Sequence, residues 1–299
     1  MKKEEVELNL YPTKSKCKII FFTKNGRKIK ILSNIEKKIT LDNRIFIEKT
    51  FRDKYIEELS NCIINEGLKY GKCKSVFINI QESDIILKNI KIDSAIKKKD
   101  IIKAVDIEIK EFCSRTFNDY FVDYKILDSN KEDTEIQVIL FPKKYVDLFS
   151  ELCDRIGIEN RAMHTNVNLL ERLLKIKGED IMENMIKMEK EHTSTGEVME
   201  MGVIEFRDDD LVVSVYAKQK VKYCCVIKKE EFTDELADKI FEKCVGIIGL
   251  GNTNADDLQI YYRLCKLCNI DFEEDVEFVQ DFKNVSPEEF FQIAAKKLN

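Results

Sequence analysis

Several features that carry chemistry in other proteins are scarce or missing in this sequence. It contains no tryptophan, two histidines and three prolines, and no uninterrupted run approaches the ~20 apolar residues that a membrane-spanning helix needs. The first residues, Met1–Glu5, are followed by strand-like alternation and not by the apolar stretch of a secretory leader. We therefore expect a soluble, intracellular protein that meets a membrane only through its partners.

Candidate catalytic and metal-binding residues are equally sparse. His164 and His192 lie in different regions, and neither stands near a nucleophile motif such as Gly-x-Ser-x-Gly. The ten cysteines are scattered through apolar patterns, and disulfides are rare inside cells. Cys265 and Cys268 form a C-x-x-C pair, but a structural zinc ion needs four ligands. We expect the cysteines to pack as small hydrophobic side chains, with no catalytic residue, metal site or cofactor.

Charge and length exclude further classes. The 50 basic and 55 acidic residues leave a net charge of −5, and the two signs are interspersed along the chain. A protein needs a basic surface to bind the phosphate backbone of a nucleic acid, so no nucleic-acid partner is expected. With 299 residues, of which 44% are hydrophobic, the chain is long enough for one large domain or for two lobes with separate cores.

The first third of the chain predicts strands and one helix. Alternating or continuous apolar residues indicate strands over Val6–Leu10, Cys17–Thr23, Lys28–Leu32, Ser75–Ile80 and Ile85–Ile92. Asn25-Gly26 is a hairpin-turn signal between the second and third of these strands. Thr50 and Asp53 have the spacing of a capping box at the start of a helix, which Gly67 would end.

The middle of the chain predicts a compact α/β unit. It contains a helix from about Lys97 to Arg115, strands Phe121–Leu127 and Glu135–Phe141, a helix Lys143–Ile156, a strand near Arg161–Thr165 and a helix Asn168–Ile176. Pro142 opens the helix that follows it, and Gly157 closes that helix.

The last third repeats the opening pattern after a polar segment. Charged and small polar residues dominate 185–200, so we expect a mobile linker there. Strands follow near Met201–Phe206, Leu211–Ala217 and Val221–Ile227, then a helix Glu230–Lys243 and a strand Val245–Ile248. Two lobes that both begin with three consecutive strands are the organisation of actin-like proteins.

An ordered series of segments carries a resemblance to a known family. The series comprises the strands 75–80 and 85–92, the helix pattern Ile101-x-x-Ala104-Val105-x-x-Glu108-x-x-x-Phe112, the segments 122–127 and 136–143, and Gly157-Ile158. Over about residues 60–175, and more weakly over the whole chain, the sequence resembles the PilM-type actin-like proteins of type IV pilus assembly. The cytoplasmic domain of the type II secretion protein GspL is the nearest relative of that family.

The resemblance implies an α/β fold of two actin-like (ribonuclease H-like) lobes with a small subdomain inserted in the first. Residues 1–85 would form the first lobe, 86–160 the inserted α/β subdomain, 161–184 a return helix and the start of a linker, 185–200 the mobile linker and 201–299 a reduced second lobe. The implied function is a non-catalytic cytoplasmic scaffold at the inner face of the cell membrane, within a pilus assembly platform.

The resemblance also implies partners. An extended tail of a PilN-like inner-membrane protein would lie between the first lobe and the inserted subdomain, and the assembly ATPase is a second implied partner. The groove residues predicted on this basis are Ile85, Leu87, Ile101, Val105 and Glu108. Asn9-Leu10-Tyr11-Pro12 is also similar to the docking segment of a PilN tail, but we favour a first strand and its turn, because the hairpin that follows fits the first lobe of the family.

Three turns at which actin-like ATPases hold nucleotide are altered. Such turns need glycine, because a side chain would fill the space of the phosphates. The first aligns with Asn9-Leu10-Tyr11-Pro12, the second with Glu205-Phe206-Arg207, and the third, Gly249-Leu250-Gly251-Asn252, keeps two glycines. We expect the third to be a plain tight turn, and we expect no ATP binding. The alternatives are an ATP-binding switch of the same fold and a GspL-like domain.

Overall fold

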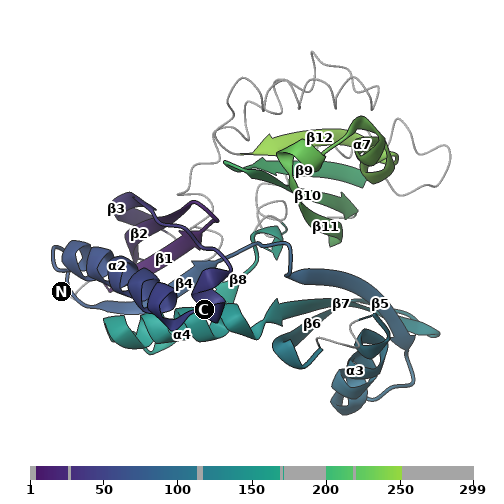
Figure 1. Ribbon diagram of the computed structural model, residues 1–299. Coiled ribbons are helices and arrows are strands. Elements are labelled where there is room, and N and C mark those ends of the chain that lie inside the picture. Colours follow the sequence, from purple (N-terminus) through teal and green to yellow (C-terminus); the bar gives the residue numbers. More distant parts are fainter. Residues whose placement is uncertain are drawn as a thin grey trace. The chain divides into compact units, whose positions relative to one another are not determined.

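The computed structural model describes residues 5–25, 28–112, 117–168, 171, 200–217 and 220–250 of the chain (Figure 1). These residues form two compact units. Unit 1 comprises the described residues of Met1–Gln81 and Ser150–Asn299, and unit 2 comprises those of Glu82–Phe149.

The first sheet of unit 1 has five strands in the order β3-β2-β1-β4-β8. They are β1 (Val6–Pro12), β2 (Lys16–Asn25), β3 (Lys28–Lys38), β4 (Cys73–Asn79) and β8 (Asn160–His164). β1, β2 and β3 are antiparallel neighbours, whereas β1, β4 and β8 run parallel. The predicted hairpin is confirmed, since Asn25 pairs with Lys28, but β3 continues six residues beyond the predicted end at Leu32.

Two helices follow β3 in the sequence, and a third precedes β8. α1 (Arg44–Ile47) leads directly into α2 (Lys49–Gly67), and a further helix, α4 (Lys143–Ile156), has the predicted bounds. The predicted capping box is wrong: Glu48 is the N-cap residue of α2, and it makes no side-chain capping bond. Because the chain arrives from α1, Thr50 already lies inside the first turn. Gly157 ends α4 with a φ of 72°, a left-handed conformation that suits glycine.

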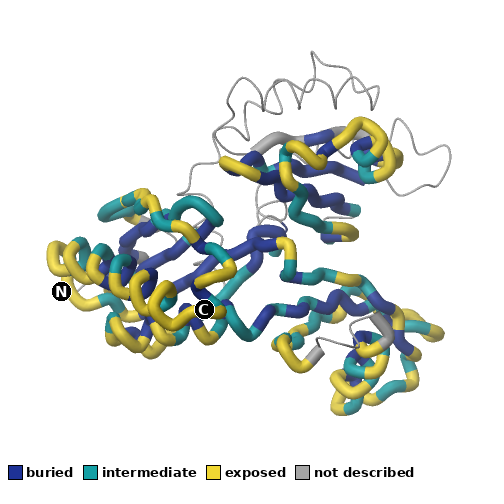
Figure 2. The backbone as a smooth tube through the Cα atoms, viewed as in Figure 1, coloured by how far each residue is buried: buried dark blue, intermediate teal, exposed yellow. Residues whose placement is uncertain are grey.

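α2 is amphipathic, and its buried side chains face the sheet. Tyr55, Ile56, Leu59 and Ile63 are buried, and the ring of Phe21 on β2 lies 3.4 Å from the position that a Cβ atom on Gly67 would take. Successive side chains of a strand point to opposite faces, so the buried run Ile19–Phe22 of β2 contributes to a core on both faces of the sheet. Figure 2 shows the strands of this sheet largely in the colour of buried residues.

The second sheet of unit 1 has four strands in the order β11-β10-β9-β12. They are β9 (Glu200–Phe206), β10 (Asp210–Ala217), β11 (Lys220–Lys228) and β12 (Cys244–Leu250). This sheet repeats the pattern of the first, with three antiparallel strands and a fourth strand parallel to the first of them. The predicted helix Glu230–Lys243 is instead a short 3₁₀ turn, Lys229–Glu231, followed by α7 (Asp234–Phe241). Thr233 caps α7 by accepting a hydrogen bond from the N–H of Leu236.

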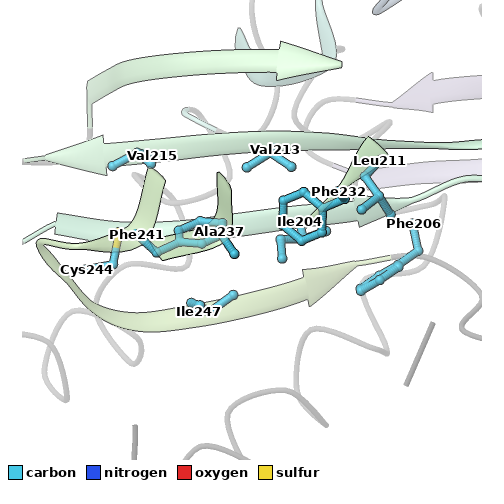
Figure 3. Packing of buried hydrophobic residues seen from close by; sticks show 10 residues of the cluster. All are labelled: Ile204, Phe206, Leu211, Val213, Val215, Phe232, Ala237, Phe241, Cys244 and Ile247. Carbon is cyan, nitrogen blue, oxygen red and sulfur yellow. The ribbon is translucent and has the colours of Figure 1, made fainter. Parts of the chain in front are cut away.

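The core of this second sheet lies between its strands and α7. Figure 3 shows the ten buried side chains: Ile204, Phe206, Leu211, Val213, Val215, Phe232, Ala237, Phe241, Cys244 and Ile247. Gly202 on β9 lies against this cluster, since a Cβ atom there would stand 2.6 Å from the Phe241 ring and 3.2 Å from Ile247.

Gly202→Ala should therefore destabilise unit 1. The added methyl group would overlap the buried ring of Phe241, and overpacking of this kind costs about 1–3 kcal/mol. Urea denaturation of Gly202→Ala, Phe241→Leu and the double variant measures the effect. We expect the double variant to lose less free energy of unfolding than the sum of the losses of the two single variants, because leucine makes room for the methyl group. Additive losses would show that the two residues do not press on each other.

Unit 2 is a three-stranded sheet with a helix on one face. The strands β5 (Ile86–Asp93), β7 (Asp133–Pro142) and β6 (Tyr120–Ser129) are antiparallel in the order β5-β7-β6. The helix predicted from Lys97 is a 3₁₀ turn, Lys98–Asp100, followed by α3 (Ile101–Phe112). The core comprises Ile90, Ile92, Ile101, Val105, Ile109, Ile136, Val138 and Leu140.

Some predicted features lie outside the described residues. They are the linker 185–200 except for its last residue, Glu200, which instead begins β9, most of the helix Asn168–Ile176, His192, Gly251, Asn252 and everything after them. Within the ranges that are described, no helix combines the length and the apolar content needed to span a membrane.

Candidate functional site

Polar side chains gather where parallel strands of the first sheet of unit 1 end. Asn9 on β1 and Asn79 on β4 are both buried, and the Nδ2 of Asn79 donates a hydrogen bond of 2.9 Å to the Oδ1 of Asn9. In open α/β sheets, ligands bind beyond the carboxyl ends of parallel strands. These strand ends, with the two asparagines beside them, are therefore the candidate site.

Next to this pair, a tyrosine of the first sheet bonds to an acid of the second. The hydroxyl group of Tyr11 donates a hydrogen bond to the carboxylate of Glu205. The Nδ2 of Asn166 lies 2.8 Å from the Tyr11 oxygen and 3.0 and 3.2 Å from the two Glu205 oxygens. Burial, and then the charge of Glu205, raise the pKa of the Tyr11 hydroxyl well above its usual value, so the phenol stays a hydrogen-bond donor.

A buried ion pair closes the turn between β9 and β10. The Nε of Arg207 lies 2.9 Å from the Oδ1 of Asp210, and the two side chains are only 6% and 5% exposed. The Nη2 of Arg207 also donates to the backbone oxygen of Gln81, at 2.8 Å. Buried charges persist when they are paired and hydrogen-bonded, and this guanidinium group meets both conditions.

The turn between β1 and β2 bonds to the same region. The Nζ of Lys14 lies 2.9 Å from the Oδ2 of Asp210. The hydroxyl of Ser15 donates to the Oδ2 of Asp208 at 2.7 Å, and the Nζ of Lys16 lies 3.2 Å from the same carboxylate. The hydrogen bond from Ser15, with that from Lys16, holds the pKa of Asp208 below its usual value. Asp208 is therefore ionised at neutral pH and pairs with the lysine as a full charge.

The residues present do not fit a magnesium–nucleotide complex. Tyr11 stands where the resemblance calls for a glycine, and Pro12 after it has no N–H to offer a phosphate. Glu205, which occupies the position of the metal-facing acid, accepts hydrogen bonds from Tyr11 and Asn166. Arg207, at the second glycine position, is buried in its own ion pair. Gly249, the first residue of the predicted third turn, lies within β12, and Gly251 and Asn252 lie outside the described residues.

The five predicted groove residues differ in burial and in the face of unit 2 on which they lie. Ile101 and Val105 are 5% and 0% exposed and belong to the core between α3 and the sheet of unit 2. Leu87 on β5 is half-buried and faces away from α3, because its neighbours Ile86 and Ile90 contact that core. Glu108 is half-buried on α3, and Ile85 is buried just before β5. Their role in docking remains a prediction, and Ile101 and Val105 are core residues.

Sequence reasoning missed the lysines that meet the acids. The sequence alone indicates no role for Lys14 and Lys16, which meet Asp210 and Asp208 nearly 200 residues away. The one available signal was a matched spacing, with two cations two residues apart in one turn and two acids two residues apart in the other. Such a match shows a contact only once the fold has brought the turns together.

Comparison with known proteins decides the fold. No protein-family model matches the sequence, and no curated protein is detectably similar to it. A PilM–PilN type IV pilus biogenesis complex is similar in structure over 99% of both chains, with a TM-score of 0.64 and 10% sequence identity. A Bacteroides thetaiotaomicron protein with an actin-like ATPase fold and unknown function is similar over 99% of this chain and 97% of its own, with a TM-score of 0.54 and 11% identity.

The chain has an actin-like fold. The predicted fold class is thereby confirmed, and so is the resemblance to PilM-type proteins at the level of the fold. The cytoplasmic domain of EpsL, an inner membrane component of the type II secretion system of Vibrio cholerae, is similar over 84% of each chain, with a TM-score of 0.49 and 10% identity.

Proposed function

We propose that this protein is a non-catalytic, actin-like scaffold on the cytoplasmic side of a type IV pilus assembly platform, where it binds the tail of a PilN-like inner-membrane protein. The observation that carries the proposal is the network of contacts between the β1–β2 hairpin and the β9–β10 hairpin. In it Tyr11 bonds to Glu205, and Lys14 bonds to Asp210. The likeness to PilM in a PilM–PilN complex supports the assignment to pilus assembly.

The network argues against nucleotide chemistry through its charge. Lys14, Lys16 and Arg207 pair with the carboxylates of Asp208 and Asp210. The third carboxylate, that of Glu205, accepts hydrogen bonds from Tyr11 and Asn166. Phosphoryl transfer needs cations aimed at the phosphates and a carboxylate that holds magnesium. Here the cations are paired with acids of the protein and Glu205 is held by neutral donors, which favours a structural role.

Partner binding is proposed for unit 2. β5 and β6 are the edge strands of its sheet, and an extended peptide can add its backbone to such an edge while its side chains enter neighbouring pockets. Leu87 lies on β5 with its side chain on the face away from α3, and it is neither core nor fully exposed. We assign it as the apolar anchor for the tail.

Titration of a fluorescent peptide tests this function. The probe is the cytoplasmic tail of the PilN-type protein from the same genome, and the full chain should bind it saturably. Leu87→Asp should weaken the affinity at least about tenfold, because a carboxylate would replace an apolar contact. Tyr223→Asp is the matched control, since Tyr223 is an aromatic residue 44% exposed on β11 of unit 1. No binding to the wild type, or equal losses in the two variants, would contradict the proposal.

A further inference from the structure

We propose that unit 1 carries a built-in electrostatic clamp, in which Lys14, Ser15 and Lys16 of the β1–β2 turn grip Asp208 and Asp210 of the β9–β10 turn. The clamp would hold the two sheets of unit 1 together without a ligand, in the place where an ATP-binding protein of this fold has its nucleotide. The inference deepens the proposed scaffold function, because it names what replaces nucleotide as the link between the two sheets.

The register of the contacts supports a clamp. Lys14 bonds to Asp210, and Lys16 bonds to Asp208, so two residues with a spacing of two in one turn match two with the same spacing in the other. Ser15, between the lysines, adds a hydrogen bond of 2.7 Å to Asp208. All three contacts join residues more than 190 positions apart. A single chance ion pair would not show this register.

Hydrogen bonds within each turn hold its charged side chains in position. In the first turn, the N–H of Thr13 donates to the oxygen of Lys16 at 2.8 Å, and the hydroxyl of Thr13 accepts from the N–H of Lys16. In the second turn, the N–H of Arg207 donates to the oxygen of Asp210 at 3.0 Å. Turns closed by their own hydrogen bonds lose little further entropy when they meet, so modest ion pairs suffice to join them.

The two carboxylates of the clamp differ in burial. Asp210 is shared between Arg207 of its own turn and Lys14 of the other; the Asp210 side chain is only 5% exposed, and that of Lys14 is 41% exposed. Asp208 is 49% exposed, and its partner Lys16 is 25% exposed. Salt screens exposed pairs far more than buried ones, because the Debye length falls from about 10 Å at 0.1 M to about 3 Å at 1 M. The Lys16–Asp208 pair, whose carboxylate is the exposed one, is therefore the part that salt or a charge reversal breaks first.

Distance measurement between the two sheets tests the clamp. Spin labels carried by noncanonical residues at Lys30 of β3 and Tyr223 of β11, both exposed, report the separation without using the native cysteines. The wild type should give a narrow distance distribution at low salt. Asp208→Lys, which sets a cation against Lys16, should broaden it about twofold, and 1 M salt should have the same effect on the wild type. The swap Lys16→Asp with Asp208→Lys should narrow it again.

The controls separate this inference from the proposed function. Asp209→Lys changes an exposed neighbour in the same turn and should leave the distribution unchanged. Equal distributions for the wild type and Asp208→Lys at every salt concentration would overturn the clamp, whatever the protein does with nucleotide. If Mg-ATP instead narrows the distribution of Asp208→Lys, the turns still accept nucleotide, and the proposed function fails while the clamp stands. Because Asp208 is exposed, the fold should survive the change, and circular dichroism checks this.

Discussion

Replacing Asp210 with alanine should lower the free energy of unfolding of unit 1 by about 3–5 kcal/mol, the cost of breaking a buried ion pair from one side. Asp210 is the carboxylate shared by Arg207 and Lys14, with its oxygens 2.9 Å from a nitrogen of each. Its removal deprives a guanidinium group that is 6% exposed of its counter-charge. It also removes one of the links between the two turns.

Asp209→Ala is the matched control for this change. Asp209 is the preceding residue in the same turn and is exposed, so its loss should change the stability by less than about 0.5 kcal/mol. Urea denaturation followed by circular dichroism measures both variants. If Asp210→Ala costs no more than Asp209→Ala, then the Arg207–Asp210 pair does not stabilise the protein, and the account of the turn is wrong.

The second large effect concerns unit 2. Val105→Asp should unfold this unit, because Val105 is 0% exposed among Ile101, Ile109 and Val138. An ionised carboxylate has no partner in such surroundings, and burying one costs several kcal/mol or forces the helix to detach. Hydrogen exchange of peptides from α3 and β7 should show loss of protection throughout the unit.

Ile107→Asp provides the comparison on the same helix. Ile107 is two residues further along α3 and is 64% exposed, so the same chemical change should leave the unit folded. The pair of variants also bears on docking, since a loss of tail binding in Val105→Asp would follow from unfolding. Protection of α3 that survives Val105→Asp would contradict the core assignment of Val105 and revive it as a groove residue.

Much of the fold could be predicted because most of its strands coincide with short apolar or alternating segments of the sequence. The three apolar segments at the start of the chain and the three after residue 200 all form strands, and both sets pair as antiparallel neighbours. The end of β3 was missed because every residue of Ser33–Lys38 except Ile35 is polar, and an edge strand with exposed positions has no apolar alternation to show. The capping box failed because α1 precedes α2 without a loop, which no local motif could indicate.

The candidate site was predictable only by residue type. The losses of glycine at Tyr11 and Arg207 are visible in the sequence, and they point away from phosphate binding. What these residues do instead depends on partners far along the chain: Tyr11 meets Glu205, and Arg207 meets the backbone of Gln81. Contacts between residues so far apart in the sequence arise from tertiary packing, so hydrophobic periodicity and turn residues do not predict them.

The most direct test of the central claim is a titration of the full chain with Mg-ATP, followed by its melting temperature and by calorimetry. A ligand that binds the native state must raise its apparent stability, by about 2.7 kcal/mol when its concentration is one hundred times the dissociation constant. Because Tyr11, Glu205 and Arg207 are bonded within the protein, we expect no heat of binding and no shift of the melting temperature at millimolar Mg-ATP. A saturable rise in melting temperature at micromolar Mg-ATP would contradict the account.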